Sequence, residues 1–331
     1  MSYMHLIHIS SISKLNHMLQ PRKESLTVFA YAALALLWGS SFLFIKLGLT
    51  GLSPGQVALG RLALGALTLV TIMTLTRRSW PRDGKLWLHM IVIGGTLCTI
   101  PFTLFAWAET QVPSTVASIF NATTPIMTLL LTPLIIPAER LSKAKTIGLV
   151  IGIAGVAVLV GPWRLLTDGE SISLPGVLAC LAATTCYGFG GLYMRRFLAH
   201  SGLDSVTAAA MQLVVATGLA LVAAPLASVG EITLTPTVVL AMLALGVLGS
   251  GIAYIWYTSI IRAWGAARAS TVTYLTPVVG VTFGVLFLGE PVHWNEPVGG
   301  LIVILGILAS QGLFERGHTT AIAEPAPAAR R

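Results

Sequence analysis

The feature that most constrains this chain is a series of ten long apolar runs, separated by short connections rich in proline, glycine, serine and charge. A helix rises about 1.5 Å per residue, so about 20 mostly apolar residues cross the hydrocarbon of a bilayer. Because the backbone finds no water there, each run must satisfy its own hydrogen bonds as a helix. Membrane-spanning helices are therefore expected over residues 26–48, 54–76, 86–108, 114–136, 144–162, 175–194, 203–226, 237–261, 267–288 and 296–314.

Composition excludes a water-soluble protein. Charged residues make up 10% of the chain and hydrophobic residues 55%, whereas soluble domains carry about 25% charged residues. Cys98, Cys180 and Cys186 all lie inside apolar runs and are interpreted as small buried hydrophobes. Cysteine and histidine do not cluster with ligand spacing, so the sequence predicts no disulfide framework, no metal and no cofactor.

Lysine and arginine are strongly biased toward one side of the predicted membrane. Seventeen of the 20 lie in the two tails or in the connections after spans 2, 4, 6 and 8, and only Arg164 lies in the opposite connections. By the positive-inside rule this predicts an inner-membrane protein with both termini in the cytoplasm. The net charge of +8 then indicates contact with anionic lipid headgroups rather than with nucleic acid. Residues 1–25 and 315–331 are expected to be cytoplasmic tails.

The chain repeats itself at an offset of about 150 residues. Ala117-Ser118 followed by Thr124-Pro125 recurs as Ala269-Ser270 followed by Thr276-Pro277, at an offset of 152. This predicts a first repeat over 26–162, an external linker over 163–174 and a second repeat over 175–314. Five crossings per repeat place the two repeats in opposite orientations, an architecture typical of secondary transporters. The predicted fold class is an all-α membrane protein of ten transmembrane helices in two inverted five-helix repeats.

Several motifs resemble the EamA-type family of the drug/metabolite transporter superfamily. They are Trp-Gly-Ser-Ser-Phe at 38–42, Pro54 followed by Arg61, Pro125 followed by Glu139-Arg140, and Pro277 followed by Gly289-Glu290-Pro291. Their order and spacing cover residues 28–314. The resemblance implies a ten-helix bundle with a central cavity that transports amino acids, other metabolites or drugs, often outward, and it leaves the substrate open.

Spans 4 and 9 each place polar side chains and a proline on one helical face, with Asn121, Thr124 and Pro125 in the first and Thr273, Thr276 and Pro277 in the second. A proline inside a helix leaves one carbonyl without its N–H partner, which is costly in lipid unless the site is buried or faces water. We therefore expect a cavity wall with hinges at Pro125 and Pro277. The alternative is a packing kink whose free carbonyl is satisfied by a Ser or Thr hydroxyl.

Arg61 lies about eight residues into span 2. An arginine at the centre of a membrane helix costs at least about 2.5–3.5 kcal/mol, so it needs a partner, water or an anionic substrate. The hypothesis is that Arg61 binds a substrate carboxylate or orients the cavity and is held by Glu109. Snorkelling to the interface is the alternative for Arg61 and the favoured interpretation of Lys46. Glu109 is also a candidate for proton coupling or for a gate.

Five aromatic residues at mid-span depth suit a wall that stacks on an organic solute, with core packing as the alternative: Trp38, Tyr187, Tyr254, Trp256 and Tyr274. The full set of candidate substrate-binding residues is Trp38, Ser41, Arg61, Asn121, Thr124, Tyr187, Gln212, Tyr254, Thr273 and Tyr274. Gly148-x-x-x-Gly152 predicts close helix contact, either within the chain or in a homodimer.

The function predicted from the sequence is secondary transport, in the outward direction, of a small organic metabolite such as an amino acid or a drug-like solute, by alternating access. Its partners would be that solute and the lipid bilayer. An intramembrane enzyme or a membrane scaffold is the alternative. Against an enzyme, the 12 acidic residues lie in tails, connections or span ends, and His-x-x-x-His, Gly-x-Ser-x-Gly and nucleotide-loop patterns are absent.

Overall fold

The computed structural model describes residues 24–139, 142–161, 163, 173–198, 201–264, 269 and 271–310. The expectations for the two tails and for most of the linker 163–174, including Arg140 and Arg164, lie outside this part of the chain. The described residues form helices and no strand. Their helical spans are Glu24–Gly48, Pro54–Leu75, Gly84–Ala108, Ser114–Ile135, Lys143–Val160, Leu174–Leu198, Ser205–Ala227, Pro236–Trp264, Val272–Leu288 and Asn295–Ser310.

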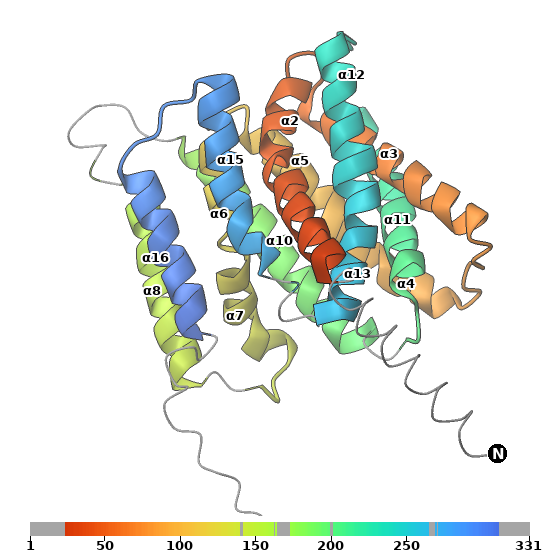
Figure 1. The fold of residues 1–331 in the computed structure, drawn as a ribbon, viewed down its shortest axis with the longest axis horizontal. Coiled ribbons are helices and arrows are strands. Elements are labelled where there is room, and N and C mark those ends of the chain that lie inside the picture. Colours follow the sequence, from red (N-terminus) through yellow and green to blue (C-terminus); the bar gives the residue numbers. More distant parts are fainter. Residues whose placement is uncertain are drawn as a thin grey trace, which may run out of the picture.

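Eight of these spans have at least 18 residues and are apolar enough to cross a membrane, and the last two are shorter apolar helices. The first five and the last five spans form two repeats, and the odd number of crossings in each reverses one repeat relative to the other (Figure 1). Most bounds agree with the predicted ones because polar caps mark them. Ser53, for example, forms a capping box with Gln56 directly before Pro54, at the start of the second span.

Several spans are interrupted, so they contain more than one element. The elements are helix 24–39, α2 (Ser41–Gly48), α3 (Pro54–Leu75), α4 (Gly84–Gly94), η1 (Gly95–Thr99), α5 (Ile100–Ala108), α6 (Ser114–Asn121), α7 (Thr124–Ile135), α8 (Lys143–Val160), α10 (Leu174–Leu198), α11 (Ser205–Ala227), α12 (Pro236–Leu243), η2 (Ala244–Ile252), α13 (Ala253–Trp264), α15 (Val272–Leu288) and α16 (Asn295–Ser310). The π-helices η1 and η2 lie in the third span of each repeat. Such wide turns are frequent at functional sites.

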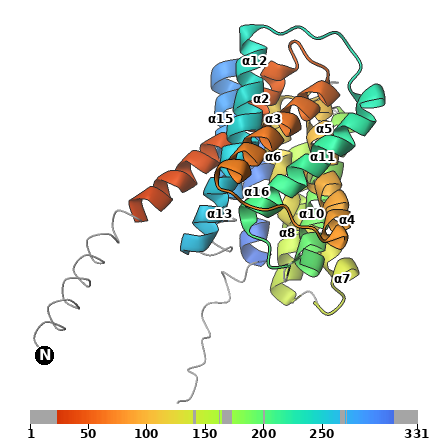
Figure 2. The ribbon, with the colours of Figure 1, turned by 90° about the vertical axis from the view of Figure 1, so that its right-hand side faces the viewer.

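Two ends of the bundle matter for the site. The tail face is the end where helix 24–39 and α8 begin and α16 ends, and it is the lower end in Figure 1. The loop face is the opposite end, which carries the connections 49–53, 109–113, 228–235 and 289–294. Helix 24–39 slants out of the bundle past α13 (Figure 2), and its Leu34 and Ala35 pack in one apolar cluster with Ala253 and Ile260 of α13.

Helices α8 and α16 lie side by side at one edge of the bundle (Figure 1). Their contact is built from glycine: a Cβ atom on Gly306 would lie 2.6 Å from the Gly152 amide nitrogen and 2.7 Å from the Gly148 carbonyl oxygen. The backbones therefore touch, which only residues without a side chain permit. The Gly148-x-x-x-Gly152 pattern thus serves packing within the chain, one of the two uses predicted for it.

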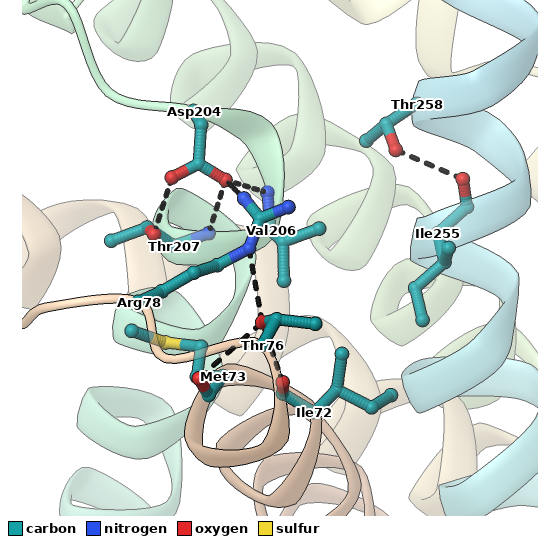
Figure 3. A network of polar contacts seen from close by, with 9 residues as sticks. All are labelled: Ile72, Met73, Thr76, Arg78, Asp204, Val206, Thr207, Ile255 and Thr258. Atoms are coloured by element: carbon teal, nitrogen blue, oxygen red, sulfur yellow. Dashed lines mark hydrogen bonds and ion pairs between the residues drawn. The ribbon is translucent and has the colours of Figure 1, made fainter.

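The two repeats are joined at the tail face by ion pairs. Arg78 pairs with Asp204, which caps α11 by accepting hydrogen bonds from the Val206 and Thr207 amides (Figure 3). Partial burial alone would raise the pKa of Asp204, but the hydrogen bonds from Thr207, the Arg78 charge and the bond from Val206 together lower it below its ordinary value. A second pair joins Arg195 of α10 to Glu139 at 2.8 Å.

Candidate functional site

A cavity of about 740 Å³ lies inside the bundle, and every span except α11 contributes to its wall. Its size is that of a site for a small organic molecule. Its lining residues are Trp38, Ser41, Phe42, Ile45, Arg61, Leu97, Phe102, Phe105, Asn121, Ala122, Thr124, Pro125, Thr128, Leu129, Lys145, Tyr187, Gly249, Ser250, Tyr254, Thr273, Tyr274, Thr276, Ile307 and Ser310.

The cavity reaches one end of the bundle and stops short of the other. Lys145, at the start of α8, and Ser310, the last residue of α16, line it at the tail face. Toward the loop face the lining ends at residues such as Ile45 and Phe105, about one helical turn before their helices end. The described conformation therefore presents its cavity to the tail face.

Arg61 lies on the cavity wall, as predicted, but its predicted partner is wrong. Its Nε donates to Ser250 Oγ of η2 at 3.0 Å, and its Cζ lies 3.9 Å from the centre of the Phe102 ring. No ion pair joins it to Glu109 in the described part of the chain. The reason is depth, because Glu109 follows the last turn of α5 at the loop face. The terminal guanidinium nitrogens make no hydrogen bond to a described residue, so they can bind an anion in the cavity.

Four of the five predicted aromatic residues line the cavity, whereas Trp256 lies off its wall and packs against Phe29 with ring centroids 6.4 Å apart. Trp38 Nε1 donates to the Gly249 carbonyl oxygen at 3.3 Å, which fixes the indole against η2. The Tyr187 ring stacks on Phe105 with centroids 6.1 Å apart. Tyr254 and Tyr274 complete this wall. Each of these four rings packs against the bundle and still faces the cavity, so packing and lining, the two alternatives, occur together.

The two Thr-Pro motifs make the same threonine-to-carbonyl hydrogen bond in both repeats. Thr124 Oγ1 donates to the Asn121 carbonyl oxygen at 2.8 Å, and Thr276 Oγ1 donates to the Thr273 carbonyl oxygen at 2.7 Å. These two carbonyls stand four residues before Pro125 and Pro277, which have no N–H to offer them. The hydroxyl compensation proposed as the alternative is thus present, on a face that also lines the cavity.

The two prolines themselves differ. Pro125 lies in the first turn of α7, after a break at Ala122 and Thr123, and not in the middle of a helix as expected. A proline there costs no intrahelical hydrogen bond. Pro277 lies inside α15, is buried, and is not on the cavity wall. Their action as hinges stays a prediction.

Ser41 lines the cavity, but Gln212 does not. Gln212 is buried on α11, where its Nε2 donates to Cys98 Sγ at 3.0 Å. The repeat offset placed it opposite Arg61, yet α11 packs along α3 and α4 and contributes nothing to the wall. Gln212 is therefore a packing residue.

Sequence reasoning missed several lining residues. Phe102, Phe105 and Thr128 look like ordinary span residues, and Ser250 lies in the π-helix η2, where its hydroxyl accepts from Arg61. Lys145 was counted solely as a topology signal. Its position one turn inside α8, beyond the Ser142 cap, is the one signal that distinguishes it from a residue of the connection.

The loop face is closed by contacts between spans. Lys46 Nζ donates to the backbone oxygen of Glu109 at 2.6 Å and to that of Val112 at 3.4 Å. The Glu109 carboxylate is fully buried, and neither of its oxygens has a hydrogen-bond partner among the described residues. Glu290, after α15, accepts from the Ser114 amide, the Ser114 hydroxyl and the Thr115 amide at 2.8–2.9 Å. This last contact joins the second repeat to the start of α6 in the first.

The model of the EamA-like transporter family matches the chain twice, over residues 25–161 and 174–310. The chain belongs to the EamA-like transporter family. It is accordingly a multi-pass membrane transporter, and this family membership speaks against the intramembrane enzyme.

Relatives of similar length bear transporter names. The "Uncharacterized inner membrane transporter YedA" of Escherichia coli is 28% identical over 86% of this chain and 90% of its own length. The "Probable terminal-alkyne amino-acid exporter" of Streptantibioticus cattleyicolor is 27% identical over 86% and 93%. The "Probable amino-acid metabolite efflux pump" of Salmonella typhimurium is 24% identical over 84% and 92%. A solved structure titled "Crystal structure of protein" shares the fold with a TM-score of 0.61 at 20% identity, covering 88% of this chain and 98% of that one.

Proposed function

We propose that this EamA-like transporter exports a small organic solute across the inner membrane by alternating access. The observation that carries the proposal is the cavity itself: it holds Arg61 and aromatic side chains, extends to the tail face, and is closed at the loop face. A solute enters from the tail face, and an inverted arrangement of the two repeats opens the loop face. Names of the relatives that include exporter and efflux pump support the outward direction.

The lysine and arginine bias supports a cytoplasmic tail face. In that orientation the described conformation is the one that loads solute from the cytoplasm. The contacts of Glu290 with α6, and of Lys46 with the end of α5, must then break before release. Glu109 belongs to this gate, because opening would hydrate a carboxyl group that is buried without a hydrogen bond from any described residue in the closed state.

Arg61 provides the test. We expect cells that express the wild-type chain to lose at least one solute to the medium relative to cells that lack it, as measured by untargeted metabolite comparison of cells and medium. Arg61→Ala removes one of the cations on the cavity wall and abolishes this export at unchanged membrane abundance. Arg82→Ala, at an exposed arginine in a connection, is the matched control and keeps export. Wild-type export by the Arg61→Ala variant would refute the assignment of the cavity as the transport site.

A further inference from the structure

The charges on the cavity wall indicate which class of solute the cavity accepts. This inference rests on the proposed function. The described residues that line it include two cations, Arg61 and Lys145, and no Asp, Glu or His. Among the described residues, the acids nearest in sequence to its ends are engaged or enclosed elsewhere. Glu109 is buried at the loop face, and Glu139 is paired with Arg195. The cavity therefore has a net positive wall.

Neither cation forms an ion pair with a described residue. Arg61 uses only its Nε, toward the neutral Ser250 hydroxyl, and stacks on Phe102. The Lys145 side chain is half-buried, and its ammonium makes no hydrogen bond or ion pair with any residue of the described ranges. A cation held in a bundle surrounded by lipid without a counter-charge is unfavourable, and an anion that enters the cavity relieves this cost at both positions.

The two cations lie at different depths. Arg61 is the eighth residue of α3 from the loop face, and Lys145 is the third residue of α8 from the tail face. Helical rise over the turns between them separates their backbones by on the order of 10 Å along the bundle. A single carboxylate therefore meets Lys145 at the mouth and Arg61 further in, one after the other, as an electrostatic funnel would require.

A positively charged group has no ionic partner among the described residues that line the cavity. The acceptors available to an ammonium group are neutral oxygens such as that of Asn121 and the aromatic faces of the wall. From this arrangement we propose that the transporter selects solutes by a carboxylate or similar anionic group, that it does not require an ammonium group, and that Lys145 is a second anion contact at the cavity mouth. An amino acid is accepted through its carboxylate, and an amine without a carboxylate is excluded.

Three compounds with the same phenyl ring test this preference for a carboxylate over an ammonium group, on the purified full-length protein in proteoliposomes. They are 3-phenylpropionate, which carries only a carboxylate, phenylalanine, which carries both charges, and phenethylamine, which carries only an ammonium group. Binding is followed by quenching of tryptophan fluorescence at millimolar concentration. We expect both carboxylates to bind, phenethylamine not to bind, and added salt to weaken carboxylate binding.

Lys145→Gln should weaken binding of both carboxylates about twofold to fivefold, a size expected for one partly exposed charge contact, and Lys145→Arg should restore it. Lys143→Gln is the matched control, since Lys143 is exposed, lies two residues earlier and is not on the wall. Binding of phenethylamine equal to that of the carboxylates, no binding of either carboxylate, or unchanged affinity in Lys145→Gln would each overturn the proposal.

The outcome is separable from that of the proposed function. If export fails in Arg61→Ala while the exported solute proves to be a cationic amine, the transport proposal stands and the anion proposal is wrong. If export is unaffected in Arg61→Ala while carboxylates bind in a Lys145-dependent manner, the cavity is an anion site and its assignment as the transport site is wrong.

Discussion

Replacing Glu290 with alanine should open the loop face. The carboxylate accepts three hydrogen bonds of 2.8–2.9 Å from Ser114 and Thr115 in the first turn of α6. A hydrogen bond to a charged group contributes roughly 1.5–3 kcal/mol, and an anion at a helix N-terminus adds about 0.3–1 kcal/mol. Glu290 is half-buried, and water replaces part of these contacts once they break. The net loss is therefore about 2–4 kcal/mol.

Because Glu290 joins one repeat to the other, this loss acts on the equilibrium between the closed and the open loop face. With tenfold per 1.4 kcal/mol, the open fraction should rise by a factor of roughly 30 to 700 while it remains small. The assay uses a variant in which Cys98, Cys180 and Cys186 are replaced by alanine and Ile45, a lining residue near the loop face, by cysteine. A membrane-impermeant thiol reagent is applied from the loop face.

Glu290→Ala should strongly accelerate labelling of the cysteine introduced at position 45. Glu290→Gln keeps an acceptor oxygen without the charge and should give an intermediate labelling rate. Glu231→Ala removes an exposed acid from another connection of the same face and serves as the control. Labelling no faster in Glu290→Ala than in the parent, or equally accelerated in Glu231→Ala, would refute the gate contact.

Three further predictions concern the scaffold. Gly306→Ala should lower the Tm in detergent, because the added Cβ would lie 2.6 Å from the Gly152 nitrogen and overpacking costs about 1–3 kcal/mol. Gly218→Ala is the control and should leave the Tm unchanged, since nothing lies within 4 Å of a Cβ there. Equal Tm values for the two variants would contradict the glycine contact. Thr276→Val should destabilise the protein by about 0.5–1.5 kcal/mol by removing the hydrogen bond that the Thr276 hydroxyl donates to the Thr273 carbonyl oxygen. The loss should be much smaller in a Pro277→Ala background, where a backbone N–H can replace the hydroxyl; equal costs in both backgrounds would exclude the compensation. The pKa of Asp204 is lowered in the folded state. Its stabilising effect is therefore present above about pH 3.9, the pKa of an unfolded Asp, and is lost as the pH falls through the folded-state pKa. The Tm of the wild-type chain should fall more steeply on acidification than that of Asp204→Asn, and parallel curves of Tm against pH would contradict this.

The ten spans and their bounds could be predicted because the bilayer imposes a length and a hydrogen-bonding rule that each apolar run meets by itself. Local caps such as Ser53 with Gln56 then mark where helices begin. The cavity residues on spans 4 and 9 were also predictable, since the proline, its hydroxyl partner and the polar face all lie within one or two helical turns.

Other features of the site depend on contacts between segments that lie far apart in the sequence. The partner of Arg61 is Ser250, 189 residues away, and it is presented by a π-helix that apolar periodicity does not reveal. Gln212 shares the repeat position of Arg61 but belongs to the one span that stays off the cavity wall. Duplication preserves sequence positions, whereas packing decides which face of each helix looks inward.

The sequence by itself determined that this chain is a membrane bundle of two repeats, because burial in lipid depends on the composition of each segment separately. Only the tertiary structure decided which end of the cavity is open, which contacts close the other, and that Lys145 joins Arg61 on an otherwise uncharged wall. Those properties arise from side chains brought together from distant spans, whose interactions have no counterpart in local sequence.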